Sequence, residues 1–236
     1  MLAAMTLAAP LTNDRILFAI FNLVALIMCV TVHEFGHAYV ADRLGDPLPR
    51  SQGRVTLNPL SHIDPVGTVL FPLMMSFGVA IPLAWGKPVE WSGHPRFLTR
   101  RFSMRTIRLF VSAAGPAMNL LLALFLSAVF LLIAKVSPGA RPMAAAILSQ
   151  LVALNLGLMF FNLLPIPPLD GRVFLEYLPR PLSPVRDTLM NYGPMIFLAL
   201  VLLGTAMHPS PIAVLLSPFN AATNWYVRTV FSLFIF

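Results

Sequence analysis

The sequence predicts an all-α polytopic membrane protein with about five transmembrane helices and one re-entrant membrane segment. Of its 236 residues, 58% are hydrophobic and only 11% are charged, and the mean hydropathy is +0.80. A soluble fold with so few charges could not cover its surface with polar groups, whereas a helical bundle in lipid has no such need. Water-soluble folds are therefore excluded.

Apolar runs of spanning length define the expected helices. A bilayer core of about 30 Å needs roughly 20 residues of helix. The core runs are 16–42, 107–134 and 143–171, the last with a Pro-rich end, and the accessory runs are 192–207 and 212–236. The final run contains Asn220, Asn224 and Arg228, so its exposure to lipid is left open. We expect residues 1–236 to form a single integral-membrane domain, because no polar connection is large enough to be a separate domain.

The stretch 66–85 is apolar enough to span, but it carries Pro72, Gly78 and Pro82 and lies between two polar loops that contain arginines. It could be a simple span, or a re-entrant hairpin that leaves the membrane by the face it entered. Non-helical backbone at membrane depth is tolerated only where protein or a watery cavity covers it. The two alternatives differ in whether the flanking loops share one face of the membrane.

Charge and cysteine content exclude two further classes of protein. The net charge of +7 comes from 16 basic and 9 acidic residues. In a membrane protein such an excess marks the cytoplasmic loops, so we expect a lipid bilayer and no nucleic acid as a partner. The single cysteine, Cys29, has no partner for a disulfide and lies in an apolar run, where a packed core residue is expected.

The first span contains His33-Glu34-Phe35-Gly36-His37, an H-E-x-x-H pattern. Two histidines at i and i+4 lie one turn apart on the same helix face, so both rings can bind one zinc ion with the Glu beside it as general base. A chance match is costly here, because ionisable groups at membrane depth lose free energy unless they are paired, hydrated or metal-bound. The motif predicts one Zn²⁺ per chain.

A catalytic zinc ion needs a third protein ligand. Asp64 in a polar loop and Asp170 in the Pro-rich run are serious candidates, and Glu176 is a distant third. Prolines unwind the end of that run, and a carboxylate on extended backbone at membrane depth is tolerated only where it lines a site. The other histidines are weaker candidates, one in a loop that could approach the site and two at the interface: His62, His94 and His208.

Three motifs occur together: H-E-F-G-H in the first span, A-G-P-A-M-N at 114–119 and N-L-L-P-I-P-P-L-D-G at 162–171. Jointly they resemble the site-2 protease family of intramembrane zinc metalloproteases, over about 16–172, which implies that family's three-helix core. The loops R-V-T-L-N-P-L-S-H-I-D-P-V-G-T and A-W-G-K-P-V are similar to those of the compact bacterial and archaeal subgroup without a PDZ or CBS domain. One departure is Arg172, which stands where the family usually has a second glycine.

The resemblance implies a role for each residue of the site. Zinc would be bound by His33, His37 and Asp170, the water would be activated by Glu34, and the oxyanion would be stabilised by Asn162. An amide on the unwound segment could reach the negative charge of a tetrahedral intermediate, and a helix-packing hydrogen bond is the alternative for Asn162. For Asn119, a role at the site and a bond that ties two helices together are both open.

Membrane topology follows if Asp170 is the third ligand. His33 lies about 27 Å along its helix from Arg15, near the exit face of the first span. Asp170 must lie at that depth at the end of its own span, which requires 66–85 to be re-entrant. Eleven basic residues then fall on the active-site face and three on the other. This bias predicts a cytoplasmic active-site face and an external N-terminus.

The sequence therefore predicts a zinc-dependent endopeptidase in the cell membrane that cleaves membrane-protein substrates within or near their transmembrane helices, in regulated intramembrane proteolysis. The alternative is a non-proteolytic zinc-binding membrane protein, such as a transporter or an inactive protease homologue. A transporter is expected to place ionisable residues at several depths, whereas this sequence gathers them at one. Regulation is expected through a membrane partner or through initial trimming of the substrate, and the oligomeric state is left open.

Overall fold

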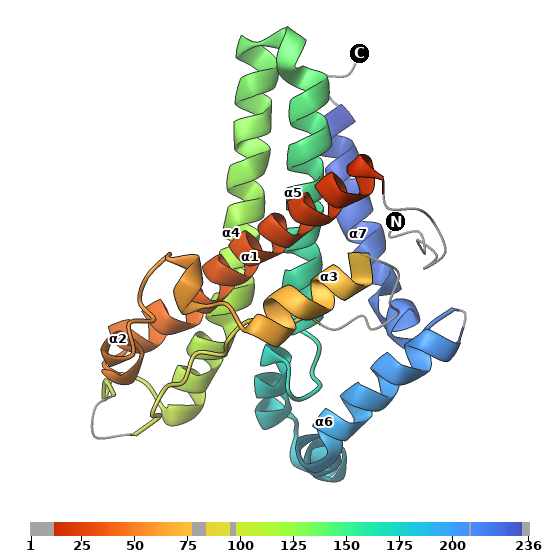
Figure 1. Ribbon diagram of the computed structural model, residues 1–236. Coiled ribbons are helices and arrows are strands. Elements are labelled where there is room, and N and C mark those ends of the chain that lie inside the picture. Colours follow the sequence, from red (N-terminus) through yellow and green to blue (C-terminus); the bar gives the residue numbers. More distant parts are fainter. Residues whose placement is uncertain (1–11, 77–83, 95–97, 208, 233–236) are drawn as a thin grey trace.

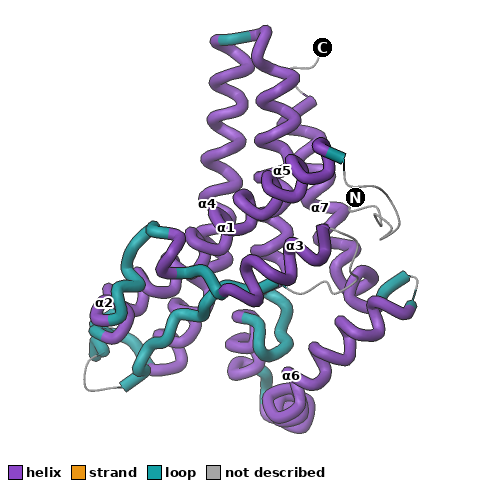
Figure 2. The backbone as a smooth tube through the Cα atoms, viewed as in Figure 1, coloured by secondary structure: helices purple, strands orange, loops and turns teal. Residues whose placement is uncertain are grey.

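The computed structural model describes residues 12–76, 84–94, 98–207 and 209–232. Within these ranges the regular elements are helices joined by loops, and no strand occurs (Figure 2). Four helices are long and apolar enough to cross a membrane: α1 (Asn13–Arg43), α4 (Met104–Val136), α5 (Arg141–Asn162) and α6 (Ser183–Ala206). The chain is a polytopic helical membrane protein, as its composition predicts.

The expected fifth span is the helix α7 (Pro211–Ser232). It is not among the four helices that meet the requirements of length and hydropathy within the described residues. Asn220, Asn224 and Arg228 interrupt its apolar character. In Figure 1 the upper part of α7 runs beside α5, and buried Phe231 joins its packing to the bundle.

The bundle is built on an antiparallel hairpin of α4 and α5, joined through a short 3₁₀ turn, η3 (Pro138–Ala140), and crossed obliquely by α1 (Figure 1). Its hydrophobic core lies between α4, α5 and α7. Phe130 and Phe231 stack there with ring centroids 4.3 Å apart. This packing fixes the two helices that flank the histidine motif.

Local sequence signals set the helix ends. The Thr12 hydroxyl accepts a hydrogen bond from the backbone N–H of Arg15 at the start of α1, and the Ser103 hydroxyl accepts one from Thr106 at the start of α4. These are N-cap bonds, which satisfy backbone donors that have no partner inside the helix. After α1 the chain turns at Gly45, whose φ of 103° suits a residue without Cβ.

Two glycines let α1 and α4 approach closely at the level of the histidine motif. A Cβ on Gly36 would lie 2.7 Å from the carbonyl oxygen of Ala114. A Cβ on Gly115 would lie 2.3 Å from His37 Nε2. Small residues at helix contacts are typical of membrane bundles, where close backbone packing drives association. The two glycines thus place the histidine face of α1 directly against α4.

The predicted re-entrant stretch begins as a π-helix, η2 (Pro65–Leu70), and continues as α3 (Phe71–Ser76). Residues 77–83 lie outside the described residues. The two flanks of the stretch meet, because the Trp85 N–H donates to the Gly67 carbonyl at 3.2 Å and the Thr68 hydroxyl donates to the Trp85 carbonyl at 2.7 Å. Residues 67–68 and Trp85, at the two flanks of the stretch, are therefore side by side, and its re-entrant path through the membrane stays a prediction.

The Pro-rich stretch after α5 folds back on the helix end and then forms a 3₁₀ helix, η4 (Asp170–Tyr177). A Cβ on Gly171 would lie 2.3 Å from the carbonyl oxygens of Leu163 and Leu164, so only glycine permits this return. Arg172 is exposed, and no described residue other than glycine has a positive φ. The turn after Asp170 therefore accommodates an arginine without a second glycine.

Candidate metal centre

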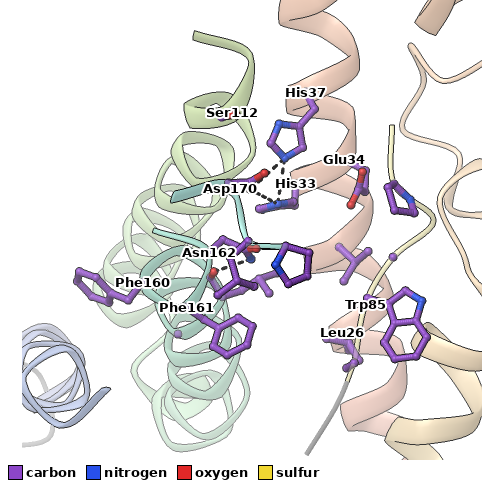
Figure 3. A pocket seen from close by; sticks show the side chains of 18 of the residues that line it. Leu26, His33, Glu34, His37, Trp85, Ser112, Phe160, Phe161, Asn162 and Asp170 are labelled. Atoms are coloured by element: carbon purple, nitrogen blue, oxygen red, sulfur yellow. Dashed lines mark hydrogen bonds and ion pairs between the residues drawn. The ribbon is translucent and has the colours of Figure 1, made fainter. Parts of the chain in front are cut away.

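The structure brings together two histidines from α1 and the aspartate that opens η4 (Figure 3). The Nε2 atoms of His33 and His37 lie 3.1 Å apart. Asp170 Oδ2 lies 3.1 Å from His33 Nε2 and 3.2 Å from His37 Nε2. Two residues one helical turn apart and a third from a distant part of the chain thus direct one atom each toward a common point.

Hydrogen bonds on the far side of each imidazole define which nitrogen carries the proton. His37 Nδ1 lies 2.7 Å from the carbonyl oxygen of Val111 in α4, and a carbonyl can only accept. His33 Nδ1 lies 2.6 Å from Oδ1 of Asn119. Both rings therefore carry a proton on Nδ1, and each neutral ring presents a lone pair from Nε2.

Three acceptor atoms that face one another without a proton between them repel, unless a cation lies among them. Asp170 Oδ2 is buried and has no hydrogen-bond partner. Space for an ion is kept by Gly115, since a Cβ there would lie within 2.7 Å of both Nε2 atoms. Two imidazole nitrogens and one carboxylate oxygen are a ligand set typical of catalytic zinc, so these residues fit a zinc ion.

Glu34 follows His33 on α1 and lines the same cavity (Figure 3). Its Oε2 accepts a hydrogen bond of 3.0 Å from the backbone N–H of Val89. Val89 belongs to the irregular segment 84–91, which passes in front of α1. One carboxylate oxygen is therefore oriented by the protein backbone, and the side chain is held at the edge of the candidate metal centre.

A cavity of about 830 Å³ opens in front of these side chains. It is lined by α1, α4 and α5, which surround the candidate metal centre, and by α3, segment 84–91, α6 and α7, and most of its wall is apolar. Hydrophobic lining residues are Leu26, Val30, Trp85, Phe161, Phe197 and Phe219. A cavity of this size accommodates several residues of peptide and keeps the polar atoms of the centre away from bulk water.

Asn162, the predicted oxyanion residue, ends α5 and lines this cavity (Figure 3). Its Nδ2 donates to the carbonyl oxygen of Leu158 at 3.0 Å. An amide nitrogen has two N–H groups, so one remains for a ligand. Asn162 therefore lies beside the candidate centre, and its bond to Leu158 is within its own helix and not between helices, so its oxyanion role stays a prediction.

The other acidic candidates have different roles. Asp64 caps η2, where its Oδ1 accepts from the backbone N–H groups of Val66 and Gly67 at 3.0 and 2.7 Å. Glu176 pairs with Arg108 at 3.1 Å. Neither joins the group formed by the two histidines, so of the three acidic candidates only Asp170 does so.

The remaining histidines also stay apart from the centre. His62 is fully buried in its loop, with Nε2 2.8 Å from the Thr56 carbonyl oxygen. His94 is exposed, and His208 lies outside the described residues. The sequence ranks these three below the H-E-x-x-H pair as candidate ligands, and it does not reveal that His62 is a buried residue of its loop.

Three participants were missed from the sequence. Val89 donates a hydrogen bond from its backbone N–H to Glu34, and a sequence motif cannot reveal a backbone contact of this kind. Arg54 and Asn155 are buried polar residues near the centre. Asn155 does carry a signal, because an amide inside an otherwise apolar span is costly unless it has a specific partner.

Comparison with known proteins gives a consistent result. The model of peptidase family M50 matches residues 21–144. Two relatives carry the name "putative zinc metalloprotease". YwhC of Bacillus subtilis (strain 168) is 37% identical over 201 residues, which cover 79% of this chain and 84% of YwhC. Rip2 of Mycobacterium tuberculosis (strain ATCC 25618 / H37Rv) is 32% identical over 188 residues, which cover 75% of this chain and 66% of Rip2. No solved structure matches the chain.

The chain therefore belongs to peptidase family M50, the site-2 protease family, and is a zinc metalloprotease. The family match spans the H-E-x-x-H motif and Asn119 but ends before Asp170. The placement of Asp170 beside the histidines is thus independent of that match, since it comes from the geometry of the Pro-rich turn.

Proposed function

We propose that this metalloprotease cleaves peptide bonds within or near the transmembrane helices of membrane-protein substrates, using a zinc ion held by His33, His37 and Asp170. The observation that carries the proposal is the triangle of two imidazole Nε2 atoms and one carboxylate oxygen, 3.1 to 3.2 Å apart, at the wall of an apolar cavity between membrane-spanning helices. A soluble peptide has little reason to enter such a cavity, whereas a helix diffusing in the bilayer already has access to it.

The chain's own groups divide the chemistry among them. Zinc at this centre would supply a Lewis acid that makes a nearby water easier to deprotonate and polarises a peptide carbonyl. Glu34 accepts a proton from the attacking water and later transfers it to the leaving amine. The N–H of Asn162 that is not bonded to Leu158 donates to the carbonyl oxygen as negative charge develops on it.

A substrate helix must unwind before its peptide bond can reach Glu34. Segment 84–91 borders the cavity and has the alternating hydrogen bonds of an extended chain, with the N–H groups of Trp85 and Lys87 both bonded to the preceding loop. Such a chain can hold an unwound peptide by strand addition. Gly86 lets the segment pack closely on α1, because a Cβ there would lie 2.4 Å from Val30 Cγ1.

We further propose that the active-site face is cytoplasmic. Six of the 16 basic residues lie in the polar loops that follow α1 and precede α4, and such basic loops are retained on the cytoplasmic side. Reporter fusions check this orientation: a reporter that is active only in the cytoplasm should function after Arg50 and fail at Gly139. The opposite pattern would reverse the proposed orientation.

The decisive experiment compares wild type with Glu34→Gln on a panel of transmembrane helices reconstituted in liposomes with the purified enzyme. We expect the substitution to lower the cleavage rate at least about 100-fold, in the range typical of losing a general base. Zinc content should be unchanged, because Glu34 is not one of the proposed ligands.

A matched control is Glu176→Gln, which alters a glutamate paired with Arg108 outside the candidate centre. It should cleave the panel at nearly the wild-type rate. Equal cleavage by wild type and Glu34→Gln would refute the proposed mechanism, and cleavage of soluble peptides alone would refute the proposed substrate class.

A further inference from the structure

We propose that Asn119 and Asn155 form an amide relay that positions His33 for metal binding. The inference rests on the proposed zinc site and adds two positioning residues to it. The relay runs from α5 through α4 to α1, and neither asparagine lines the substrate cavity. Each acts on the metal centre only through hydrogen bonds to the next residue.

The relay begins at a fixed point in α5. Asn155 Nδ2 donates to the backbone carbonyl of Leu151 at 2.9 Å and also lies 3.1 Å from Cys29 Sγ. A carbonyl oxygen can only accept, so this bond fixes which end of the Asn155 amide is the nitrogen. The amide oxygen, Oδ1, consequently points toward Asn119.

The same logic determines the orientation of Asn119. Its Nδ2 donates to Asn155 Oδ1 at 2.9 Å and to the backbone carbonyl of Cys29 at 3.1 Å. With both N–H groups used, Oδ1 faces His33 Nδ1 at 2.6 Å. An amide oxygen cannot donate, so His33 Nδ1 carries the proton and Nε2 is left free for the metal.

Burial makes the relay specific. Asn119 and Asn155 both have 0% of their surface exposed. A buried amide inside a membrane bundle is destabilising unless its polar atoms are satisfied, so neither side chain can rotate away without losing several bonds at once. His33 therefore has a partner of fixed orientation, where a water molecule would impose none.

The two histidines are positioned by different means. His37 donates to the backbone carbonyl of Val111, which no side-chain substitution removes. His33 depends entirely on the Asn119 side chain. Substitution can therefore disturb one proposed ligand and leave the other in place, which makes the relay testable.

If Asn119 and Asn155 had only a structural role, they would act as a polar contact that holds helices together. The protein contains another polar contact of this kind, which serves as the comparison. Gln150 of α5 donates to Asn22 of α1 at 2.8 Å, and Asn22 in turn donates to the carbonyl of Phe18. This pair joins α5 to α1 as the relay does, but without α4, and it ends on a backbone carbonyl of α1. Gln150→Leu therefore removes a tie between α1 and α5 without affecting a proposed metal ligand.

The experiment measures zinc dissociation constants by chelator competition on the full-length protein in detergent, for wild type, Asn119→Leu, Asn155→Leu and Gln150→Leu. Loss of the hydrogen bond at the nitrogen of a ligating histidine that does not bind the metal typically weakens metal binding by about 10- to 100-fold. We expect this range for Asn119→Leu, about 5- to 10-fold for Asn155→Leu, and less than about twofold for Gln150→Leu.

Cobalt(II) loading supplies a readout that helix stability alone would not move. Its visible absorption reports ligand geometry, so the spectrum should change in both asparagine variants and stay unchanged in Gln150→Leu. If Asn155→Leu does not fold, Asn155→Ala removes the same acceptor and is used in its place.

The outcomes separate the relay from the site on which it rests. If wild type binds no zinc, the proposed metal site fails. If wild type binds zinc and Asn155→Leu matches Gln150→Leu in affinity and cobalt spectrum, the metal site stands and the relay is refuted.

Discussion

The two walls of the cavity differ in how firmly they are packed. The wall that carries the candidate metal centre consists of α1, α4 and α5, whose contact faces are buried along most of their length and joined by bonded side chains. The second wall consists of α3, segment 84–91, α6 and α7, and no described residue of α3 is buried. On α6 the buried residues form one narrow stripe, Gly193, Phe197 and Val201.

This difference indicates that the two walls have different functions. Metal ligands must be held within a fraction of an ångström, so they lie where helices are locked together. A substrate helix must enter and unwind, which requires a side of the cavity with few contacts to break, and segments of low packing density open at the smallest cost. Changes to the first wall should therefore affect metal binding, and changes to the second should affect turnover with the metal retained.

The largest effect is expected from Gly115→Ala on the packed wall. The new methyl group would lie 2.3 Å from His37 Nε2 and 2.7 Å from His33 Nε2. Both rings are held from behind by hydrogen bonds at Nδ1, so neither can move aside freely. We expect zinc affinity to fall more than about 100-fold, which exceeds the effect of losing a hydrogen bond to a ligating histidine. Cleavage should be lost in parallel.

Gly157→Ala is the matched control for this change. Gly157 also lines the cavity, on α5, but a Cβ there meets no atom within 4 Å. Its zinc affinity should equal that of wild type. Wild-type zinc affinity in Gly115→Ala would show that the space beside the two Nε2 atoms is not the metal position.

A smaller effect is expected from Arg54→Met, which loosens the second wall at segment 84–91. Arg54 is 3% exposed, and its guanidinium donates to the carbonyls of Ser61 and Lys87, tying segment 84–91 to the preceding loop. Burial lowers the pKa of this guanidinium below its usual value, a sign that its desolvation is costly. Without it two carbonyls lose their donor, and Val89 is less firmly held against Glu34.

For Arg54→Met we expect kcat/KM for a transmembrane substrate to fall about tenfold, the equivalent of one unmade buried hydrogen bond, while zinc content stays at the wild-type level. Arg50→Met serves as the control, since Arg50 makes an exposed pair with Asp42 at 2.7 Å and such pairs contribute little. Loss of zinc in Arg54→Met would contradict the division between the two walls.

Most of the fold could be predicted from the sequence, because the bilayer imposes a length and an apolar composition on each span. The ends of α1 and α4 lie within a few residues of the predicted runs. The start of α6 was missed, since its first turns contain Arg186 and Asp187 and hydropathy does not detect a polar helix start. Whether α7 is exposed to lipid could not be predicted, because its asparagines and Arg228 interrupt the apolar run. The described part of α7 is also not among the helices that meet the requirements for a span.

For the candidate site, the sequence predicts only those features that depend on spacing or composition within a single element. The i, i+4 spacing places His33 and His37 on one face, and the prolines mark the Asp170 turn as unusual. The contacts from Asn119 to His33 and from Asn155 to Asn119 depend on the relative rotation of three helices, which no local pattern encodes. Likewise, the bond between Val89 and Glu34 requires a loop that returns across α1, so it could be found only in the structure.

The zinc content of purified Asp170→Ala tests the central claim most directly, with Asp64→Ala as the matched aspartate that caps η2. Measured per chain at buffered free zinc, wild type and Asp64→Ala should each contain one zinc ion, and Asp170→Ala should contain almost none while remaining folded. A full zinc complement in Asp170→Ala, or none in wild type, would contradict the proposed His33, His37 and Asp170 ligand set.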